Sequence, residues 1–282
     1  IAVSHTLGVP HPPGSPFFLL LGRIASMLPI TEDIAFRVNL LSPISSAFAV
    51  MFLYLVIVLL VANWKGGIKN YQDSLVSFGG GVIGSLTFAF TDSHWFNAVE
   101  AEVYAFSTFF TAIVVWLILK WNEKADEIGN ERYILIIAYM IGLATGLHLL
   151  NLLAIPFIAL IIYFKKYEPN WKTFGYTVII TGIIFFLIHN VIIKGMPKIA
   201  DSIGVWGAAC LVLSVFVFMI WAIKNQKLIL SLSLTSMVLI LIGYSTYALI
   251  FIRSNQDPGI DENDPETIEA FISYLEREQY GD

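Results

Sequence analysis

Long apolar runs separated by short polar segments dominate the chain. Six of these runs, at residues 37–62, 75–91, 103–121, 173–193, 204–223 and 228–252, are close to the length that crosses a lipid bilayer as one helix. In lipid, every backbone donor and acceptor must be satisfied within the spanning segment, so each run is expected to be a helix and strands are not expected. The pattern predicts an all-α polytopic membrane protein.

A seventh apolar stretch, residues 133–164, is long for one span and short for two. Positively charged residues flank it, with Lys120, Lys124 and Arg132 before it and Lys165, Lys166 and Lys172 after it. Loops rich in Lys and Arg stay on the cytoplasmic side, so the stretch must enter the membrane and return. We predict two short helices, 133–147 and 152–164, whose bend carries His148 and Asn151 near the outer surface. About eight spans result, with both chain ends outside.

Two further segments are predicted to be surface helices. Residues 17–28 are too few to span and contain Arg23, which favours an interfacial or re-entrant helix at the outer surface near the N-terminus. After the last span, Asp264 and Pro265 suit the first positions of a helix. Its apolar positions recur with helical spacing: Ile268, Phe271, Ile272 and Leu275. We therefore divide the chain into a transmembrane domain, 1–252, and an outer linker with an amphipathic helix, 253–282, that packs on the protein's outer membrane surface or on a soluble domain beyond this chain.

Composition agrees with a membrane protein. Hydrophobic residues make up 57% of the 282 residues and mean hydropathy is +0.76, which lies outside the soluble range. The single cysteine, Cys210, lies inside an apolar run, so it is expected to be buried and offers no disulfide or metal site. The chain starts at Ile1 without a signal-peptide pattern, and we interpret it as a piece of a longer protein.

The predicted topology sorts the charged residues between the two sides. Ten of the sixteen Lys and Arg fall inside: Lys65, Lys69, Lys120, Lys124, Arg132, Lys165, Lys166, Lys172, Lys224 and Lys227. The outer face is net negative and holds all five histidines. This sorting is expected if the chemistry faces outward, although the positive-inside rule explains much of it.

A polar island at residues 91–104 interrupts the apolar pattern and carries Asp92, His94, Glu100 and Glu102. The two glutamates are about 200° apart on a regular helix, so only one of them is expected to face a given site. Solvated loop glutamates, with Asp92 or Ser93 capping a helix, are one interpretation. The other is a carboxylate at the outer mouth of a helix bundle that handles a proton or orients a ligand.

The remaining candidate residues are predicted near the same side. His11 heads the run H-P-P-G-S-P, whose prolines restrict the backbone to a rigid extended loop. His148 and Asn151 form either a site or a hydrogen-bonded bend, and Arg253 is either an interfacial anchor or a phosphate clamp. The acidic residues at 257–264 fit turns better than a calcium loop, and no histidine pair has zinc spacing. We therefore assign no metal and no cofactor.

Five motifs, in order, carry a resemblance to a known family. They are G-V-P-H-P-P-G-S-P-F-F (8–18), R-V-N-L-L-S (37–42), A-E-V-Y-A (101–105), G-L-H-L-L-N (146–151) and R-E-Q-Y-G-D (277–282). Together they resemble the protein O-mannosyltransferase-like family of the GT-C membrane glycosyltransferases, in its Bacteroidetes-type branch of unknown function. The resemblance implies a GT-C-like bundle that uses a polyprenyl-phosphate-linked sugar as donor.

The resemblance also implies roles for particular residues. Glu102 matches the acidic residue of the A-E-V motif and is expected to orient donor or acceptor, with Asp92 and Glu100 as further catalytic candidates. The substrate-binding candidates are His11, Arg37, His94, His148, Asn151 and Arg253, of which Arg37, Arg253 and His148 are assigned to the phosphate. The family's first span and its first acidic motif, with the presumed catalytic Asp, are expected upstream of residue 1, so this fragment is expected to be catalytically incomplete.

The sequence therefore favours a glycosyltransferase that moves a mannose-like sugar to a protein hydroxyl or an envelope glycan. Its expected partners are membrane lipids, the lipid-linked donor and the acceptor, with no nucleic acid. We expect it in a bacterial inner membrane, with the active side facing the periplasm. A secondary transporter, suggested by the interrupted stretch at 133–164, and a noncatalytic envelope scaffold remain alternatives.

Overall fold

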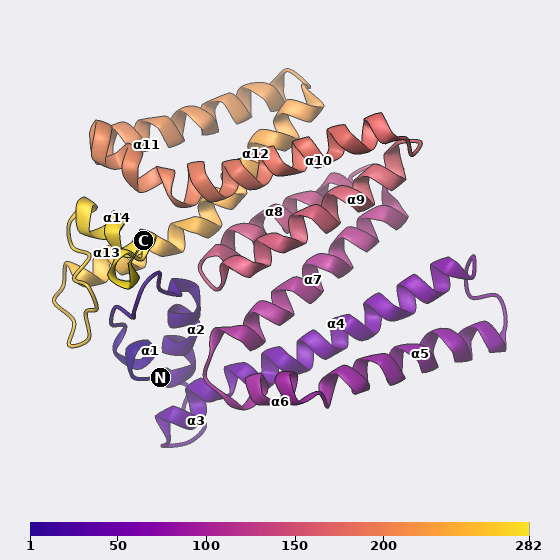
Figure 1. The fold of residues 1–282 in the computed structure, drawn as a ribbon, viewed down its shortest axis with the longest axis horizontal. Coiled ribbons are helices and arrows are strands. Elements are labelled where there is room, and N and C mark those ends of the chain that lie inside the picture. The colour runs from indigo at the N-terminus through magenta and orange to yellow at the C-terminus, as the bar shows by residue number, and fades with distance from the viewer. Residues whose placement is uncertain (282) are drawn as a thin grey trace.

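The computed structural model describes residues 1–281, and within them the chain is helical and contains no strand. Eight long helices lie side by side in a bundle (Figure 1). These are α4 (Leu41–Trp64), α5 (Tyr71–Ala89), α7 (Val103–Lys124), α8 (Glu131–Thr145), α9 (Ala154–Lys166), α10 (Trp171–Phe186), α11 (Gly195–Lys224) and α12 (Leu228–Tyr244). The predicted all-α class is confirmed, and each predicted span corresponds to one of these helices.

The helices have the length and composition of membrane spans. Among the described residues, six helical segments are long and apolar enough to cross a bilayer, and α5 with α6 (Asp92–Val99), bent by 64°, is a seventh. The remaining predicted span, α8, has only 15 residues, whereas α9, with 13, reaches 18 together with the turn that precedes it. The chain is an integral, multi-pass membrane protein.

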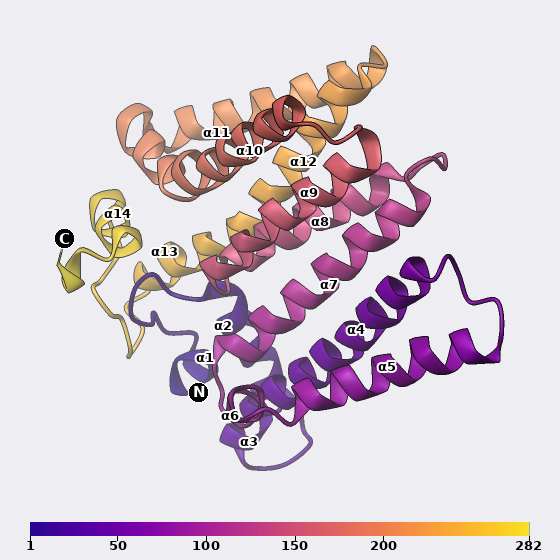
Figure 2. The same ribbon diagram turned by 45° about the vertical axis from the view of Figure 1, so that its right-hand side comes forward.

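The bundle has two distinct ends (Figures 1 and 2). The far end consists of the loops between α4 and α5, α7 and α8, α9 and α10, and α11 and α12. The ten Lys and Arg predicted to lie inside are in these loops or in the helix ends beside them. Asp126 there pairs with Lys165 at 2.9 Å and with Lys166 at 3.3 Å, and their hydrogen bonds lower the pKa of its carboxyl. The pocket end holds Ile1, the last described residue Gly281 and the short helices α1 (Ala2–Thr6), α2 (Pro16–Met27), α3 (Ile34–Asn39), α6, α13 (Ala248–Ser254) and α14 (Ile268–Glu276).

The predicted hairpin at 133–164 is confirmed. Helices α8 and α9 are separated by a 3-10 turn at Leu149–Leu153, and the bend lies at the pocket end. Asn151 holds the bend, because its Oδ1 accepts hydrogen bonds from Thr111 at 2.9 Å and Ser107 at 3.2 Å on α7. Its Nδ2 donates to the carbonyl oxygen of His148 at 2.9 Å. The bend is therefore fixed to α7 by buried polar contacts.

Helices α8 and α12 cross at a pair of glycines. A Cβ on Gly142 would lie 2.5 Å from the carbonyl oxygen of Ile240, and one on Gly243 would lie 2.4 Å from the carbonyl carbon of Gly142. No larger residue fits this crossing without a backbone shift. Beside it, the Tyr247 hydroxyl donates to the carbonyl oxygen of Thr145 at 3.1 Å.

The segment after the last span, residues 255–281, packs on the start of the chain and is called the tail segment below. Val9 N donates to Ile260 O at 2.8 Å, Glu262 N donates to Val9 O at 3.2 Å, and the Tyr274 hydroxyl donates to Pro10 O at 2.7 Å. Tyr274 and Leu275 are buried. The apolar face of the predicted amphipathic helix thus packs on this same chain.

Three sequence expectations need correction. Helix α14 begins at Ile268 with Thr267 as its cap, because Asp264 has a positive φ of 44° and its carboxylate accepts from Ser254 instead. Cys210 is exposed, since it lies on the outward face of α11. No single helix carries Glu100 and Glu102, because α6 ends at Val99 and α7 begins at Val103.

Candidate functional site

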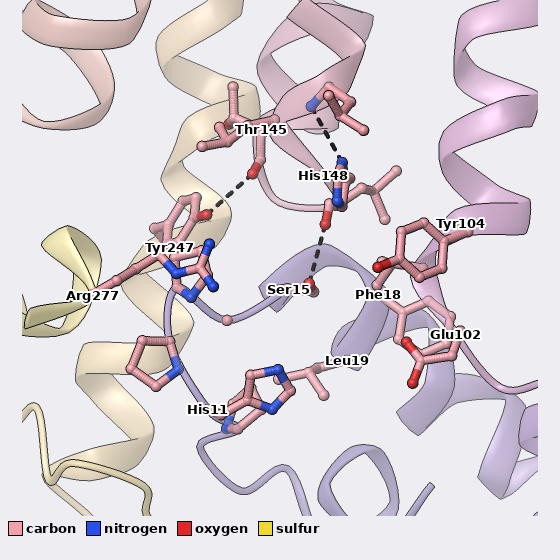
Figure 3. A pocket seen from close by; sticks show the side chains of 18 of the residues that line it. His11, Ser15, Phe18, Leu19, Glu102, Tyr104, Thr145, His148, Tyr247 and Arg277 are labelled. Atoms are coloured by element: carbon pink, nitrogen blue, oxygen red, sulfur yellow. Dashed lines mark hydrogen bonds between the residues drawn. The ribbon is translucent and has the colours of Figure 1, made fainter. Parts of the chain in front are cut away.

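A pocket of about 650 Å³ opens at the pocket end of the bundle (Figure 3). Its walls come from the 10–15 loop, α2, the turn between α6 and α7, the bend after α8, the end of α10 and the tail segment. The side chains that bring ionisable or hydrogen-bonding groups into it include His11, Glu102, Tyr104, His148, His189 and Arg277. Residues more than 250 positions apart in the sequence therefore share one cavity.

The proline loop at residues 10–15 forms one wall. Gly14 has a φ of +71°, and a Cβ there would lie 2.6 Å from the Tyr274 hydroxyl, so both the backbone and the space require glycine. Ser15 Oγ donates to Leu147 O at 3.1 Å, which ties the loop to the bend after α8. These contacts keep His11 at the pocket. The loop is held in place, but it is a turn and not extended as predicted, because Gly14 N donates to His11 O at 3.0 Å.

Glu102 lies on another wall, at the start of α7. It occupies the N-cap position in an extended conformation, and its carboxylate makes no capping bond. The backbone leading to it is anchored by Asn39 Nδ2, which donates to Val99 O at 3.0 Å. Glu100 ends α6 and does not line the pocket, whereas Glu102 does. The turn between α6 and α7 therefore places only one of the two glutamates at the pocket.

His148 stands at the bend between Glu102 and the tail segment. Its Nδ1 accepts a hydrogen bond from Leu150 N at 3.2 Å, which places the proton of a neutral imidazole on Nε2. The Tyr104 ring centroid lies 5.4 Å from the imidazole centroid. Burial, and secondarily the positive charge of Arg277, lower the pKa of His148 below its ordinary value of 6.5. At neutral pH His148 therefore presents a neutral donor.

The other predicted site residues lie away from the pocket. Asn151 is buried and occupied by the bend contacts described above, in agreement with the hydrogen-bonded alternative. The guanidinium of Arg253 donates to Leu7 O at 2.6 Å, and that of Arg37 donates to Leu28 O at 2.9 Å. Both therefore bind the backbone of their own chain.

The remaining two predicted site residues, Asp92 and His94, belong to α6. His94 is buried with its ring 4.4 Å from that of Phe88, and its Nε2 has no hydrogen-bond partner among the described residues. Asp92 is exposed at the first position of α6. Thr91, not Asp92 or Ser93, occupies the N-cap, and no side chain caps the helix. The substrate roles of Asp92, Glu100, Arg37, His94, Asn151 and Arg253 stay predictions.

Two pocket residues were not singled out from the sequence. Arg277 follows α14 in the left-handed conformation, with φ 63°, and its guanidinium lies over the Tyr280 ring at 5.1 Å. His189 lies in a π-helical turn, Leu187–Ile193, and stacks on Phe185 with centroids 6.1 Å apart. The sequence did contain a signal for each residue. Arg277 begins the motif at 277–282, and His189 is an ionisable side chain within an apolar run, a position that suggests a functional residue.

A second cavity of about 360 Å³ lies between α9 and α10. Its lining is mainly apolar and includes Pro156, Leu160, Phe174, Val178 and Gly182. Phe185 lines both cavities. A pocket with ionisable side chains thus neighbours an apolar groove between two membrane helices, and the pair fits a molecule with a polar head and a long apolar tail.

The fold and these cavities define a polytopic α-helical membrane protein with a polar pocket at one end of its bundle. Residues 1–172 match the profile of a family described as the protein O-mannosyl-transferase TMEM260 N-terminal domain. The chain belongs to this family, and the predicted resemblance is confirmed. The matched range contains His11, Glu102, Tyr104 and His148, whereas His189 and Arg277 lie beyond it.

Two relatives carry the same name. The chain is 30% identical over 187 residues to the protein O-mannosyl-transferase tmem260 of Dictyostelium discoideum, a match that covers 61% of this chain and 21% of the relative. It is 28% identical over 144 residues to the protein O-mannosyl-transferase TMEM260 of Mus musculus, covering 51% of this chain and 18% of the relative. The chain thus matches only about a fifth of the length of these relatives. No solved structure matches it.

Proposed function

We propose that this chain is the membrane part of a glycosyltransferase that moves a mannose-like sugar from a polyprenyl phosphate to a hydroxyl of a protein or an envelope glycan. The observation that carries the proposal is that the pocket with its ionisable side chains and the apolar groove lie next to each other, with Phe185 lining both. A lipid-linked sugar likewise has an apolar and a polar part, because its tail lies in the bilayer and its sugar phosphate needs polar contacts. The names of the two relatives support the transferase class.

In the proposed reaction, the acceptor hydroxyl oxygen attacks the anomeric carbon of the sugar. The bond from that carbon to the phosphate oxygen breaks, and the polyprenyl phosphate leaves with the bonding electron pair while the hydroxyl proton passes to a base. Glu102 accepts a hydrogen bond from a hydroxyl of the donor or the acceptor and orients it. The Nε2–H of neutral His148 donates toward the negative charge that grows on the leaving phosphate, an effect that is strong in a pocket screened from water.

We further propose that the pocket faces the periplasm across a bacterial inner membrane. The grouping of ten Lys and Arg at the far end supports this, because loops with such an excess remain on the cytoplasmic side. A donor held in the groove would then enter from the bilayer while the acceptor approached from outside. This arrangement brings a lipid-borne and a water-borne substrate to one pocket.

The test compares Glu102→Gln with Glu100→Gln in the full-length protein. Both changes remove one charge and keep the side-chain shape, but only Glu102 lines the pocket. Mannose transfer from polyprenyl phosphate mannose should fall on the order of 10²-fold in Glu102→Gln, because the reacting hydroxyl loses its orientation, and little in Glu100→Gln. Parent-like transfer by Glu102→Gln at matched expression would remove Glu102 from the site, and no transfer by the parent itself would overturn the proposed function.

A further inference from the structure

The tail segment is firmly attached beside the pocket. Besides the Tyr274 bond to Pro10, Lys198 of α11 pairs with Glu276 at 2.6 Å. Tyr274 is buried, with 1% of its surface exposed, and lies against Gly14 of the proline loop. Contacts on both sides therefore fix the last turn of α14, and the residue that follows it has a defined place.

That residue is Arg277. It ends α14 in a left-handed conformation, and Figure 3 shows its guanidinium reaching the pocket near Tyr247. Of the Lys and Arg in residues 1–281, it alone lines this pocket. No carboxylate within that range forms an ion pair with it. Its charge is held in place by the Tyr280 ring and remains available to a ligand.

The charges of the pocket lie on opposite walls. Figure 3 shows Arg277 and Glu102 on either side of the cavity, with His11 and His148 between them. A guanidinium offers planar, paired donors that match phosphate oxygens, whereas a carboxylate accepts hydrogen bonds from hydroxyl groups. The walls therefore suit a ligand with an anionic group at one end and hydroxyls at the other, which is the order found in a sugar phosphate.

We propose that Arg277 binds the phosphate of the lipid-linked donor, and that Tyr274 is the positioning residue that holds α14 against the proline loop for this contact. The inference rests on the proposed function, which supplies a phosphate in this pocket. It goes further by assigning the phosphate to the tail segment, outside the range matched to the family. Arg37 and Arg253, the candidates suggested by the sequence, bind backbone carbonyls away from the pocket instead.

The experiment measures binding of polyprenyl phosphate and of the uncharged polyprenol with the same chain to the full-length protein in nanodiscs. The two probes share a tail, so the ratio of their affinities reports the phosphate contact alone. The parent should prefer the phosphate, and Arg277→Gln should reduce that preference about tenfold or more. Arg277→Lys, which keeps the charge but not the paired donors, should keep part of it. Lys224→Gln is the matched control, because that cation is exposed at the end of α11, away from the pocket and from α14.

Tyr274→Phe tests the positioning role, since it removes only the hydroxyl that bonds to Pro10 O. Alone it should lower the phosphate preference by less than Arg277→Gln does. Added to Arg277→Gln it should lower it no further, because the affected contact is already absent. A purely structural effect would weaken binding of both probes equally and leave the preference unchanged, which would overturn the role of Tyr274.

The outcomes separate this inference from the proposed function. A parent that prefers the phosphate, with the same preference in Arg277→Gln, would overturn the assignment to Arg277 and leave the lipid-linked donor in place. A parent without any preference would overturn both. Equal KM values for the donor in Arg277→Gln and the parent would also contradict the assignment, whereas a raised donor KM with an unchanged acceptor KM supports it.

Discussion

His148 lies between the pocket wall that carries Arg277 and the wall that carries Glu102. The pKa of its imidazole therefore tests whether the Arg277 guanidinium lies close to it. Burial and the charge of Arg277 both oppose its protonation. Replacing Arg277 by Gln should therefore raise the pKa of His148 toward 6.5, as measured from the pH dependence of its imidazole NMR signals. Lys224→Gln, at the far end of the bundle, should leave that pKa unchanged. An unchanged pKa in Arg277→Gln would show that its charge does not act on the bend.

The same lowered pKa affects stability. Because the folded state disfavours the protonated imidazole, His148 contributes stability above its ordinary pKa of 6.5, and this is lost as the pH falls toward the folded value. The unfolding temperature of the parent should thus decline below about pH 6.5 more steeply than that of His148→Gln. Parallel curves for the two proteins would contradict this linkage.

Asn151 is predicted to stabilise the bend after α8 and not to bind a ligand. Asn151→Leu leaves Ser107 and Thr111 without their shared acceptor, at a cost of about 1–2 kcal/mol in unfolding free energy. Adding Thr111→Val to Asn151→Leu should cost less than Thr111→Val alone, because the two residues share one hydrogen bond. Additive losses measured by chemical unfolding would show that the contact is not stabilising.

At the residue scale, the sequence located some pocket residues and missed others for physical reasons. His11, Glu102 and His148 stood out because polar side chains next to apolar runs mark the ends of spans. Arg277 did not, because an arginine at the end of a surface helix ordinarily faces water. Its direction depends on the left-handed residue after α14 and on the contact of Tyr274 with Pro10, which joins positions 264 apart.

At the scale of elements, the crossing of α8 and α12 should be intolerant of any side chain. Gly142→Ala would place a methyl group 2.5 Å from Ile240 O, so it should destabilise the protein by about 1–3 kcal/mol. Gly79→Ala on α5 is the control, because nothing lies within 4 Å of its Cβ position. Thermal unfolding of both variants checks this, and equal midpoints would show that the helices can separate without cost.

Helix positions were more predictable than helix starts. Length and flanking charge were enough to derive the hairpin of α8 and α9, because both reflect the thickness of the bilayer and the positions of its faces. The predicted start of α14 was wrong because two residues, Asp264 and Thr267, could each cap the helix. Only the fold decides between them, since Ser254 engages Asp264 and leaves Thr267 to accept from Ala270 N at 3.1 Å.

At the scale of the whole molecule, the far end should face the cytoplasm. Single cysteines at Lys69, Glu127 and Lys166, in a Cys210→Ala background, should resist an impermeant thiol reagent in intact cells. A cysteine at Gln256, at the pocket end, should react. Labelling of Glu127→Cys without permeabilisation would reverse the orientation and with it the periplasmic assignment of the pocket.

The meeting of the tail segment with residues 7–10 has a consequence for biosynthesis. The proline loop is among the first parts of this chain to leave the ribosome, but its partners Ile260 and Tyr274 follow some 250 residues later. At about 5–20 residues per second, the loop waits on the order of 10–50 s for them. Throughout this interval the growing chain has inserted helices but no closed pocket. The wall that Arg277 contributes is therefore added to the pocket only when translation has passed α14.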